Sequence, residues 1–183
     1  MKLPVLSTGL LLITLNVVFA TPRADTARFR ALLRTSESWV QRNIDSCESL
    51  ALEARGVAVA DHDRHEEADA IAELAVFYRL KAEYATATQY YQQARGIYDS
   101  VRDWCAEASC LVQLAQLYKD IAGIKQTNKL LDQGVQYALA AYKVYDRERD
   151  TVGMMVALNE MGIIYRDKGK VPKDAFFYDT AYT

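Results

Sequence analysis

The sequence has little proline and little glycine. Its 183 residues include 3 prolines and 8 glycines, about 6% together, which is half of the usual ~12%. Because these residues form many turns, their scarcity argues against most all-β folds. The prolines are Pro4, Pro22 and Pro172, so residues 23–171 contain nothing that forbids a helix. The composition therefore predicts a mostly helical protein.

The chain also has no large excess of positive or negative charge. The chain has 22 Lys and Arg against 24 Asp and Glu, a net charge of −2. Removal of residues 1–20, whose one charged side chain is Lys2, would leave 21 bases and a net charge of −3 (21 − 24). This balance gives no electrostatic case for nucleic acid or anionic membrane as a partner. With 51% hydrophobic and 25% charged residues, the chain is neither a disordered tail nor a polytopic membrane protein.

The first twenty residues are typical of an export signal. Lys2 precedes an apolar run over residues 5–19, and the small residue Ala20 follows it. The run is short for a membrane span, and its end suits signal peptidase. We expect cleavage after Ala20 and a periplasmic or extracytoplasmic location. A retained N-terminal anchor is the alternative, because Lys2 is the one basic residue. No cysteine follows the run, so a lipoprotein is not expected.

Cysteine is scarce as well. The three residues are Cys47, Cys105 and Cys110. On one helix, Cys105 and Cys110 would lie ~7.5 Å apart along the axis and ~140° apart around it, which is poor geometry for a disulfide. Cys47 and Cys110 occupy positions that carry Ala or Gly elsewhere in the repeat described below. Small buried thiols are the favoured interpretation, and their redox state stays open.

Three segments share one pattern, and they are residues 71–78, 111–118 and 158–165. Each has a large apolar residue, another three positions later followed at once by a small residue, and then a tyrosine three positions further. Their starts are 40 and 47 residues apart. Eleven residues before the second apolar position stand Asp63, Asp103 and Asp150. Such self-similarity predicts a repeat protein.

Each copy has the spacing of a pair of helices. The apolar residues fall at i, i+3, i+4 and i+7, which is one face of an α-helix. The small residue is the place where a second helix would approach closely. That helix is visible after the first copy as a stripe of alternating Tyr and Ala, namely Tyr84, Ala87, Tyr91, Ala94 and Tyr98.

At these residues the sequence resembles the tetratricopeptide repeat (TPR) family. Residues 71–94 match nearly every place of its signature. Residues 158–181 match less well, with Asp174 where Ala is expected and Pro172 in the turn. The middle copy departs further, with residues 121–126 as a link to a lengthened second helix that ends near Tyr145. The resemblance implies an all-α, right-handed α-solenoid of three to four stacked antiparallel pairs, the last one incomplete.

The register predicts five segments. They are a signal peptide at 1–20, a degenerate helix pair at 27–62, repeats at 65–102 and 104–148, and a truncated repeat at 153–183. At the end of the chain we favour a fragment of a longer protein. The alternative is that a partner or a second copy covers Phe176, Phe177 and Tyr182. The units are also similar to the extracytoplasmic repeats of some bacterial sensor kinases and regulators.

No motif for catalysis, a metal or a cofactor stands out. The two histidines, His62 and His65, lie among acids in residues 61–67. Asp63 recurs as Asp103 and Asp150 without histidine, so a solvated loop with helix-capping acids is favoured over a metal site. The sequence contains no nucleophile elbow, no glycine-rich phosphate loop and no Cys-x-x-Cys pair. Most of its 12 tyrosines are assigned to packing. We therefore expect no enzyme and no cofactor.

A base follows each signature tyrosine, as Arg79, Lys119 and Arg166. The resemblance implies that the first helices line a concave groove, where these cations would stand ~10 Å apart. Such a row suits an acidic segment or a C-terminal carboxylate of a peptide. The alternative is a solvated face, because Asp120 and Asp167 follow directly and can neutralise Lys119 and Arg166. The other expected groove residues are Val76, Gln116, Asn159 and Ile163.

Two functions follow as hypotheses. The first is a non-catalytic, exported interaction module that holds a peptide or protein in its groove, as the sensory part of a larger signalling protein. The second is a structural spacer or dimerisation segment, with self-association through the uncapped C-terminal end. Charge reversal at Arg79, Lys119 and Arg166 would abolish partner capture only in the first case.

Overall fold

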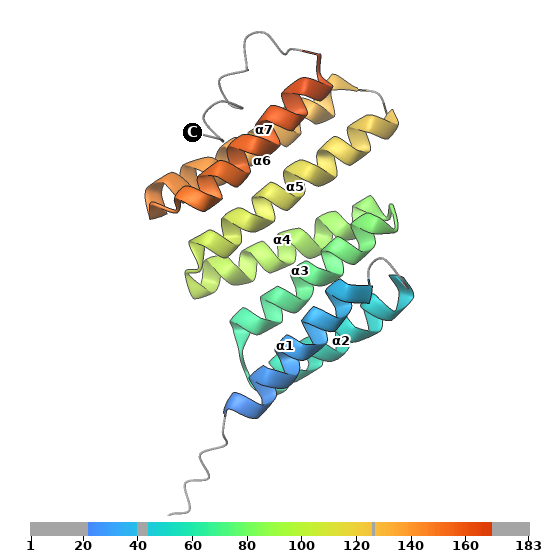
Figure 1. Ribbon diagram of the computed structural model, residues 1–183, viewed down its shortest axis with the longest axis vertical. Helices are drawn as coiled ribbons and strands as arrows, with labels where there is room; N and C mark the ends of the chain where they lie inside the picture. Colours follow the sequence, from blue (N-terminus) through green and yellow to red (C-terminus); the bar gives the residue numbers. More distant parts are fainter. Residues whose placement is uncertain (1–21, 40–43, 126, 170–183) are drawn as a thin grey trace, which may run out of the picture.

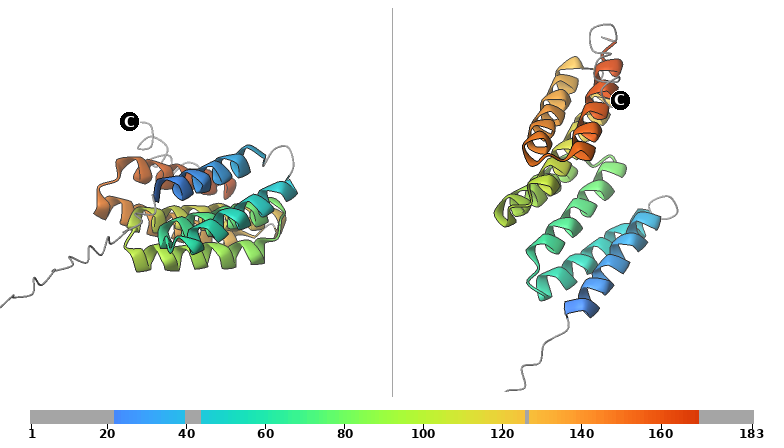
Figure 2. Two further views of the ribbon diagram at one scale, coloured as in Figure 1. Left: turned by 90° about the horizontal axis from the view of Figure 1, so that it is seen from below. Right: turned by 60° about the vertical axis from the view of Figure 1, so that its left-hand side comes forward.

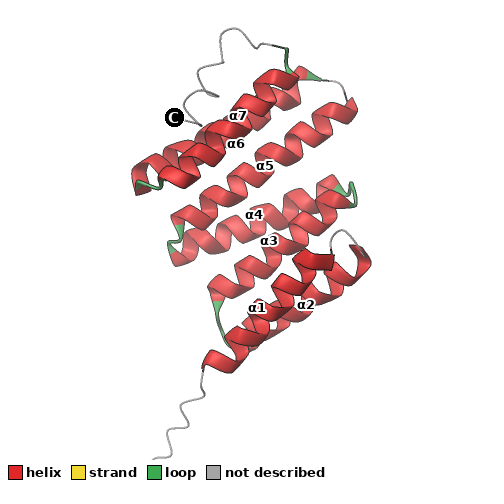
Figure 3. Cartoon of the chain, viewed as in Figure 1, coloured by secondary structure: helices red, strands yellow, loops and turns green. Residues whose placement is uncertain are grey.

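The computed structural model describes residues 22–39, 44–125 and 127–169, and within them it contains seven α-helices and no strand (Figures 1 and 3). The predicted signal peptide at 1–20 lies outside the described residues, as do Pro172, Asp174, Phe176, Phe177 and Tyr182. Within the described ranges, no helix combines the length and apolarity that a membrane crossing requires.

The helices follow one another as a regular series of pairs. They are α1 (Pro22–Trp39), α2 (Ile44–Ala60), α3 (Arg64–Leu80), α4 (Tyr84–Val101), α5 (Trp104–Lys125), α6 (Asn128–Glu148) and α7 (Thr151–Asp167).

Each helix packs against the next, so that the chain rises from α1 to α7 as a stack of antiparallel neighbours (Figures 1 and 2). Contacts also join α1 to α3 and α5 to α7. In a curved stack the helices on the inner side approach one another more closely. We call α1, α3, α5 and α7 the inner helices and α2, α4 and α6 the outer helices. The arrangement confirms the predicted all-α solenoid.

The recurring aspartates begin three of the four inner helices. The Oδ1 atoms of Asp63, Asp103 and Asp150 each accept a hydrogen bond of 2.9 Å from the backbone N–H three residues later. The residue before each of them has a positive φ of 57°, 61° or 58°. A left-handed residue that ends one helix, followed by a capping acid that starts the next, makes a short and sharp connection. The prediction of capping acids is confirmed.

The repeat positions form the core. Ile71, Leu74 and Ala75 are fully buried, as are Leu114 and Ala115, and Gly162 is buried at the same register position in α7. Cys47 and Cys110 are buried where other pairs carry Ala or Gly, and both are free thiols, as is the half-buried Cys105. An added Cβ at Gly134 would lie 3.2 Å from the carbonyl oxygen of Ala115. Small residues therefore let the two helices of a pair touch.

Two of the three signature tyrosines also pack against a second ring. Tyr78 stacks on Tyr90 with 5.3 Å between ring centroids, and Tyr118 packs on Tyr137 at 5.2 Å. Tyr90 and Tyr137 are 47 residues apart and share one register position. The repeat thus contains an aromatic pair between its two helices.

The middle pair differs from the sequence-based prediction. Helix α5 continues to Lys125, so residues 121–125 are helical and the expected link there is wrong. The extra length lies in both helices: α5 has 22 residues against 17 in α3, and α6 has 21 against 18 in α4. Ala122 lies seven residues after Ala115 and is buried in the same cluster. The apolar stripe of the helix simply continues there, which stabilises the added turn.

We expect Gly153→Ala to lower the free energy of unfolding. An added Cβ would lie 2.2 Å from Cδ1 of the buried Tyr145 ring, and such overpacking costs about 1–3 kcal/mol. Urea unfolding followed by circular dichroism measures the change. The matched control is Gly96→Ala in α4, where nothing lies within 4 Å of an added Cβ, and it should gain up to about 1 kcal/mol. Equal effects of the two substitutions would contradict the close contact.

Candidate functional site

The predicted basic row forms ion pairs between successive inner helices. Arg79 of α3 donates from Nη1 to Oδ2 of Asp120 in α5 at 2.9 Å. Lys119 of α5 lies with its Nζ 3.3 Å from Oε1 of Glu160 in α7. Each base thus reaches an acid on the next inner helix. The row is an inter-helix ladder of ion pairs, and the first two of its cations are already neutralised.

The neutralisation expected from sequence neighbours is only partly right. Asp120 pairs with Arg79 and not with Lys119, whereas Asp167 does lie near Arg166, with 3.7 Å between its Oδ1 and Nε. Side chains at i and i+1 on a helix point in different directions, and Asp120 accordingly pairs across to α3 and not with its sequence neighbour Lys119. The Arg166 side chain is 60% exposed.

Two partners of this ladder, Arg79 and Glu160, are largely shielded from solvent. Burial lowers the pKa of Arg79, but the hydrogen bond that Arg79 donates to Asp120 and the neighbouring charges together raise the pKa above its ordinary value. The Glu160 side chain is 5% exposed. Within the described residues its Oε1 has no hydrogen-bond partner, so the contact with Lys119 is an ion pair that lacks hydrogen-bond alignment. A buried carboxylate of this kind depends on its cation.

A cavity of about 420 Å³ opens between α3 and α5 on the inner side. Its walls carry Ala72, Glu73 and Val76 from α3 and Ser109 and Gln113 from α5, and Leu33 reaches it from α1. We call this cavity the concave groove. Among the expected groove residues, Val76 lines it. Lys119 lines a different hollow of about 360 Å³ beside the α5–α6 turn.

The remaining expected groove residues lie further along the stack. Gln116 on α5, and Asn159 and Ile163 on α7, are half-buried. The structure thus does not gather the seven predicted residues in one place. The sequence reasoning missed Asp69, Glu73, Ser109 and Gln113. The signal for the first two was present, because residues 69, 72, 73 and 76 form one stripe of α3 at helical spacing.

His65 joins three helices at one end of the concave groove. Its Nε2 lies 2.7 Å from Oδ2 of Asp103, and its Nδ1 lies 3.4 Å from Oδ2 of Asp69. The Tyr98 hydroxyl donates to Oδ1 of Asp69 at 2.5 Å, and the Tyr98 ring packs edge-on against the imidazole. Since Asp103 also caps α5, this cluster connects α3, α4 and the start of α5.

The charge around His65 favours its protonated form. Burial lowers its pKa, but the hydrogen bond with Asp103 and the charges of Asp69, Asp103 and Asp63 raise the pKa above the ordinary 6.5. Arg30 and Arg34 of α1 line the same hollow as His65. Within the described ranges, no group of three or more His, Cys, Asp and Glu side chains is arranged to hold a metal ion.

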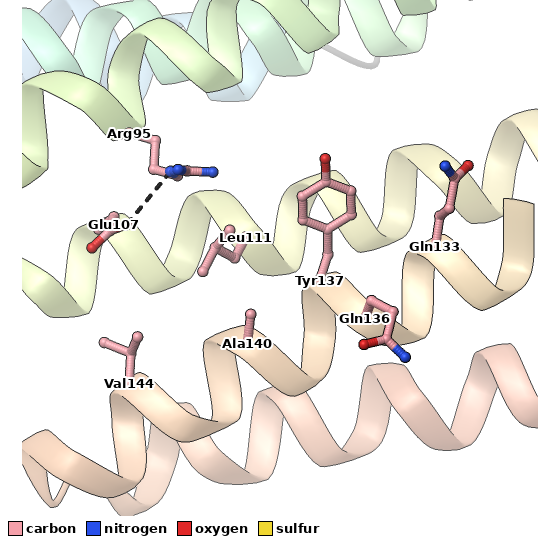
Figure 4. Close-up of a pocket in the computed structure, with 8 residues that line it drawn as sticks. All are labelled: Arg95, Glu107, Leu111, Gln133, Gln136, Tyr137, Ala140 and Val144. Carbon is pink, nitrogen blue, oxygen red and sulfur yellow. Dashed lines mark ion pairs between the residues drawn. The ribbon is translucent and has the colours of Figure 1, made fainter.

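A larger cavity of about 580 Å³ lies on the other side of the stack, between α4 and α6 (Figure 4). Arg95 and Glu107 form an ion pair at one end, with 3.5 Å between Nε and Oε1. Tyr137 rises from α6 toward α4 (Figure 4). The walls otherwise consist of aliphatic side chains and two glutamines.

Comparison with known proteins identifies the fold. No protein-family model and no curated protein matches the sequence. The structure is similar to that of BtubC (BKLC) from P. vanneervenii, with a TM-score of 0.72 and 17% identity over 88% of this chain and 63% of that chain. It is also similar to the nearly identical TPR-like repeats of a putative kinesin light chain from Podosopora anserina, with a TM-score of 0.63 and 14% identity over 85% and 74% of the two chains.

These neighbours confirm that the chain has a TPR-like fold, as the repeat register predicted. The chain spans less than two thirds of the length of BtubC. At such low identity the likeness concerns the fold alone.

We expect Lys119→Met to lower the free energy of unfolding by about 3 kcal/mol, because it leaves the Glu160 carboxylate buried without a cation. The matched control is Arg166→Met, which removes an exposed ion pair and should cost less than about 0.5 kcal/mol. Urea unfolding at neutral pH measures both. Addition of Glu160→Gln to Lys119→Met should restore part of the loss. A double variant as unstable as Lys119→Met alone would contradict the role of the charge.

The stability of the stack should depend on pH through His65. Because its folded pKa lies above 6.5, protonated His65 stabilises the fold. This contribution is fully present below pH 6.5 and is lost as the pH rises through the folded pKa. We therefore expect the melting temperature to fall between pH 5.5 and 8.5. Thermal unfolding across this pH range measures the change.

His62 provides the control, since the chain has two histidines and the contacts with Asp69 and Asp103 are made by His65. His65→Gln should flatten the fall, whereas His62→Gln should leave it in place. A profile that stays the same in His65→Gln would show that another group is responsible.

Proposed function

We propose that the chain is a non-catalytic protein-interaction module that holds a segment of a partner protein in its concave groove. The observation that carries the proposal is the cavity of about 420 Å³ between two inner helices. Stacked helix pairs form an extended concave surface, which repeat proteins use for binding. The exposed Ser109 and the half-buried Gln113 offer hydrogen-bond groups beside small apolar residues. This combination suits a polypeptide segment.

The walls of the groove are held in place before a partner binds. The ion pair of Arg79 with Asp120 joins α3 to α5 at one end, and the cluster of His65, Asp69 and Asp103 joins them at the other. A groove with fixed walls loses little conformational freedom on binding, which favours affinity.

The reactive groups near the groove are held in their unreactive forms. Burial raises the pKa of the Cys110 thiol to about 12 and that of the Tyr91 hydroxyl to about 12. Both groups therefore stay protonated at neutral pH, whereas a nucleophile needs the deprotonated form. This chemistry supports binding over catalysis.

The wider setting of the module is part of the same proposal. Residues 1–20 resemble an export signal, which supports a role outside the cytoplasm. The likeness of the units to the extracytoplasmic repeats of some bacterial sensor kinases and regulators supports a place as the sensory part of a larger signalling protein. A spacer or dimerisation segment is the second candidate. It is favoured by the exposed apolar side chains of Val152, Met155 and Val156 on α7, because the residues at the register position of Met155 in α3 and α5, Ala68 and Ala108, are fully buried.

The binding proposal predicts that Ser109→Trp abolishes partner capture, because an indole at this exposed position would fill the groove. The matched control is Ser49→Trp, at an exposed serine of the outer helix α2. Affinity capture followed by quantitative mass spectrometry compares the two variants with the unaltered protein, and circular dichroism checks their folding.

Partners that are captured by both the unaltered protein and the Ser49→Trp variant should not be captured by the Ser109→Trp variant. If a folded Ser109→Trp variant keeps all of them, the groove is not the binding surface. A spacer would lose nothing in either variant.

A further inference from the structure

The cap aspartates of α5 and α7 also contact the preceding inner helix. Oδ2 of Asp103 lies 2.7 Å from Nε2 of His65, which stands two residues after the cap of α3. Cys105 stands at the same place in α5, and its thiol hydrogen-bonds with Asp150, the cap of α7. Oδ1 of each aspartate meanwhile accepts from the first turn of its own helix. The two junctions, from α3 to α5 and from α5 to α7, are therefore built alike.

The two junctions differ in the group that can change its charge near neutral pH. Burial and the charge of Asp150 raise the pKa of the Cys105 thiol above its ordinary 9.0, so this thiol is neutral between pH 5.5 and 8.0. The imidazole of His65 takes up a proton within the same range. A proton-dependent contact is therefore expected between α3 and α5, which form the concave groove, and not between α5 and α7.

Both ring nitrogens of His65 face carboxylate oxygens. Besides the contact of Nε2 with Asp103, Nδ1 lies 3.4 Å from Oδ2 of Asp69. A neutral imidazole carries one N–H and can donate to one of these acids, whereas an imidazolium donates from both nitrogens. Loss of the proton leaves one carboxylate opposite a lone pair. The geometry is therefore that of the protonated junction.

Four acids and two bases of the described residues line the hollow of His65 or contact its ring. They are Asp63, Glu66, Asp69 and Asp103, and Arg30 and Arg34 of α1. Their net charge is −2 (2 − 4), which favours a cation on the imidazole. From α4 the ring faces Tyr98, whose hydroxyl stays neutral because burial raises its pKa. The surroundings from α1, α3, α4 and the start of α5 thus stabilise the charged ring.

The contact with His65 reaches the wall of the concave groove through the first turn of α5. Ala106 lines the groove, and its N–H donates to Oδ1 of Asp103 at 2.9 Å. Asp69 lines the groove from α3. The imidazolium lies between Asp69 and Asp103, so it joins the wall that α3 supplies to the wall that α5 supplies.

We propose that a proton on His65 regulates the concave groove, so that the groove holds a partner segment more tightly when the imidazole is charged. The inference rests on the proposed function and adds its regulation. With the proton in place, α3 and α5 are clamped before the partner binds, and less conformational freedom is lost on binding. The affinity therefore falls as the pH rises through the pKa of His65, which lies above 6.5.

The first test follows the two caps by NMR in the ¹⁵N-labelled full chain between pH 5.5 and 8.0. The amide of Ala106 reports the cap of α5, and the amide of Gly153 reports the equivalent cap of α7. We expect the Ala106 amide to titrate with the same midpoint as the His65 ring, and the Gly153 amide to stay constant. A constant Ala106 amide, or equal titration of both amides, would overturn the proposal.

Exchange of the two side chains separates this junction from other effects of pH. His65→Cys gives it the thiol of the next junction and should abolish the titration of the Ala106 amide. Cys105→His should create a titration at Gly153. If His65→Cys fails to fold, His65→Gln takes its place. An Ala106 amide that titrates unchanged in a folded His65 variant would show that another group is responsible, and the proposal would fail.

The second test repeats the affinity capture at pH 6.0 and pH 8.0, with the partners that Ser109→Trp loses as probes. The unaltered protein should bind them about threefold more tightly at pH 6.0, as expected from a partly exposed ion pair, and His65→Cys should show no difference.

Two results of the second test would overturn the regulation and leave the proposed function standing. They are equal binding by the unaltered protein at both pH values, and the same pH difference in the unaltered protein and His65→Cys. If Ser109→Trp loses no partner, the proposed function itself fails and its regulation with it.

Discussion

The close approach of paired helices at small residues is the constraint on which the rest of the structure depends. Gly134 lies so close to α5 that an added Cβ would be 3.2 Å from the Ala115 carbonyl oxygen. Ala75 and Ala87, at the matching places of α3 and α4, are fully buried. Because such contacts fix the spacing within each pair, the curvature of the stack is set by the connections between pairs. The concave groove is a consequence of that curvature.

Several charged residues hold the repeats of this chain together. The three capping aspartates start inner helices, and the ladder through Arg79 and Lys119 joins one inner helix to the next. Inner helices of a curved stack lie close, so a long base at the end of one reaches an acid of its neighbour. Arg79 and Lys119 would be open to a ligand only if the stack were flatter, because neighbouring inner helices would then lie further apart. The Glu160 side chain is almost fully buried beside Lys119, so this contact between inner helices is nearly closed to solvent.

The sequence predicts what depends on periodicity within a helix, and it fails where partners come from different helices. The register identified Ile71, Leu74 and Ala75 as core and Asp63 as a cap, because each follows from local spacing. It assigned Asp120 to Lys119, its neighbour in sequence. In the structure, Asp120 pairs with Arg79, forty-one residues away. The pairing of Tyr78 with Tyr90 was missed for the same reason, although both positions recur at the repeat spacing.

Asp69 links the stability of the stack to the chemistry of its groove. One of its carboxylate oxygens accepts from Tyr98 and the other lies near His65, which reaches across to the cap of α5. The same carboxylate lines the groove. A proton on His65 strengthens the contact between two repeats and, at the same time, reduces the negative charge that the groove presents.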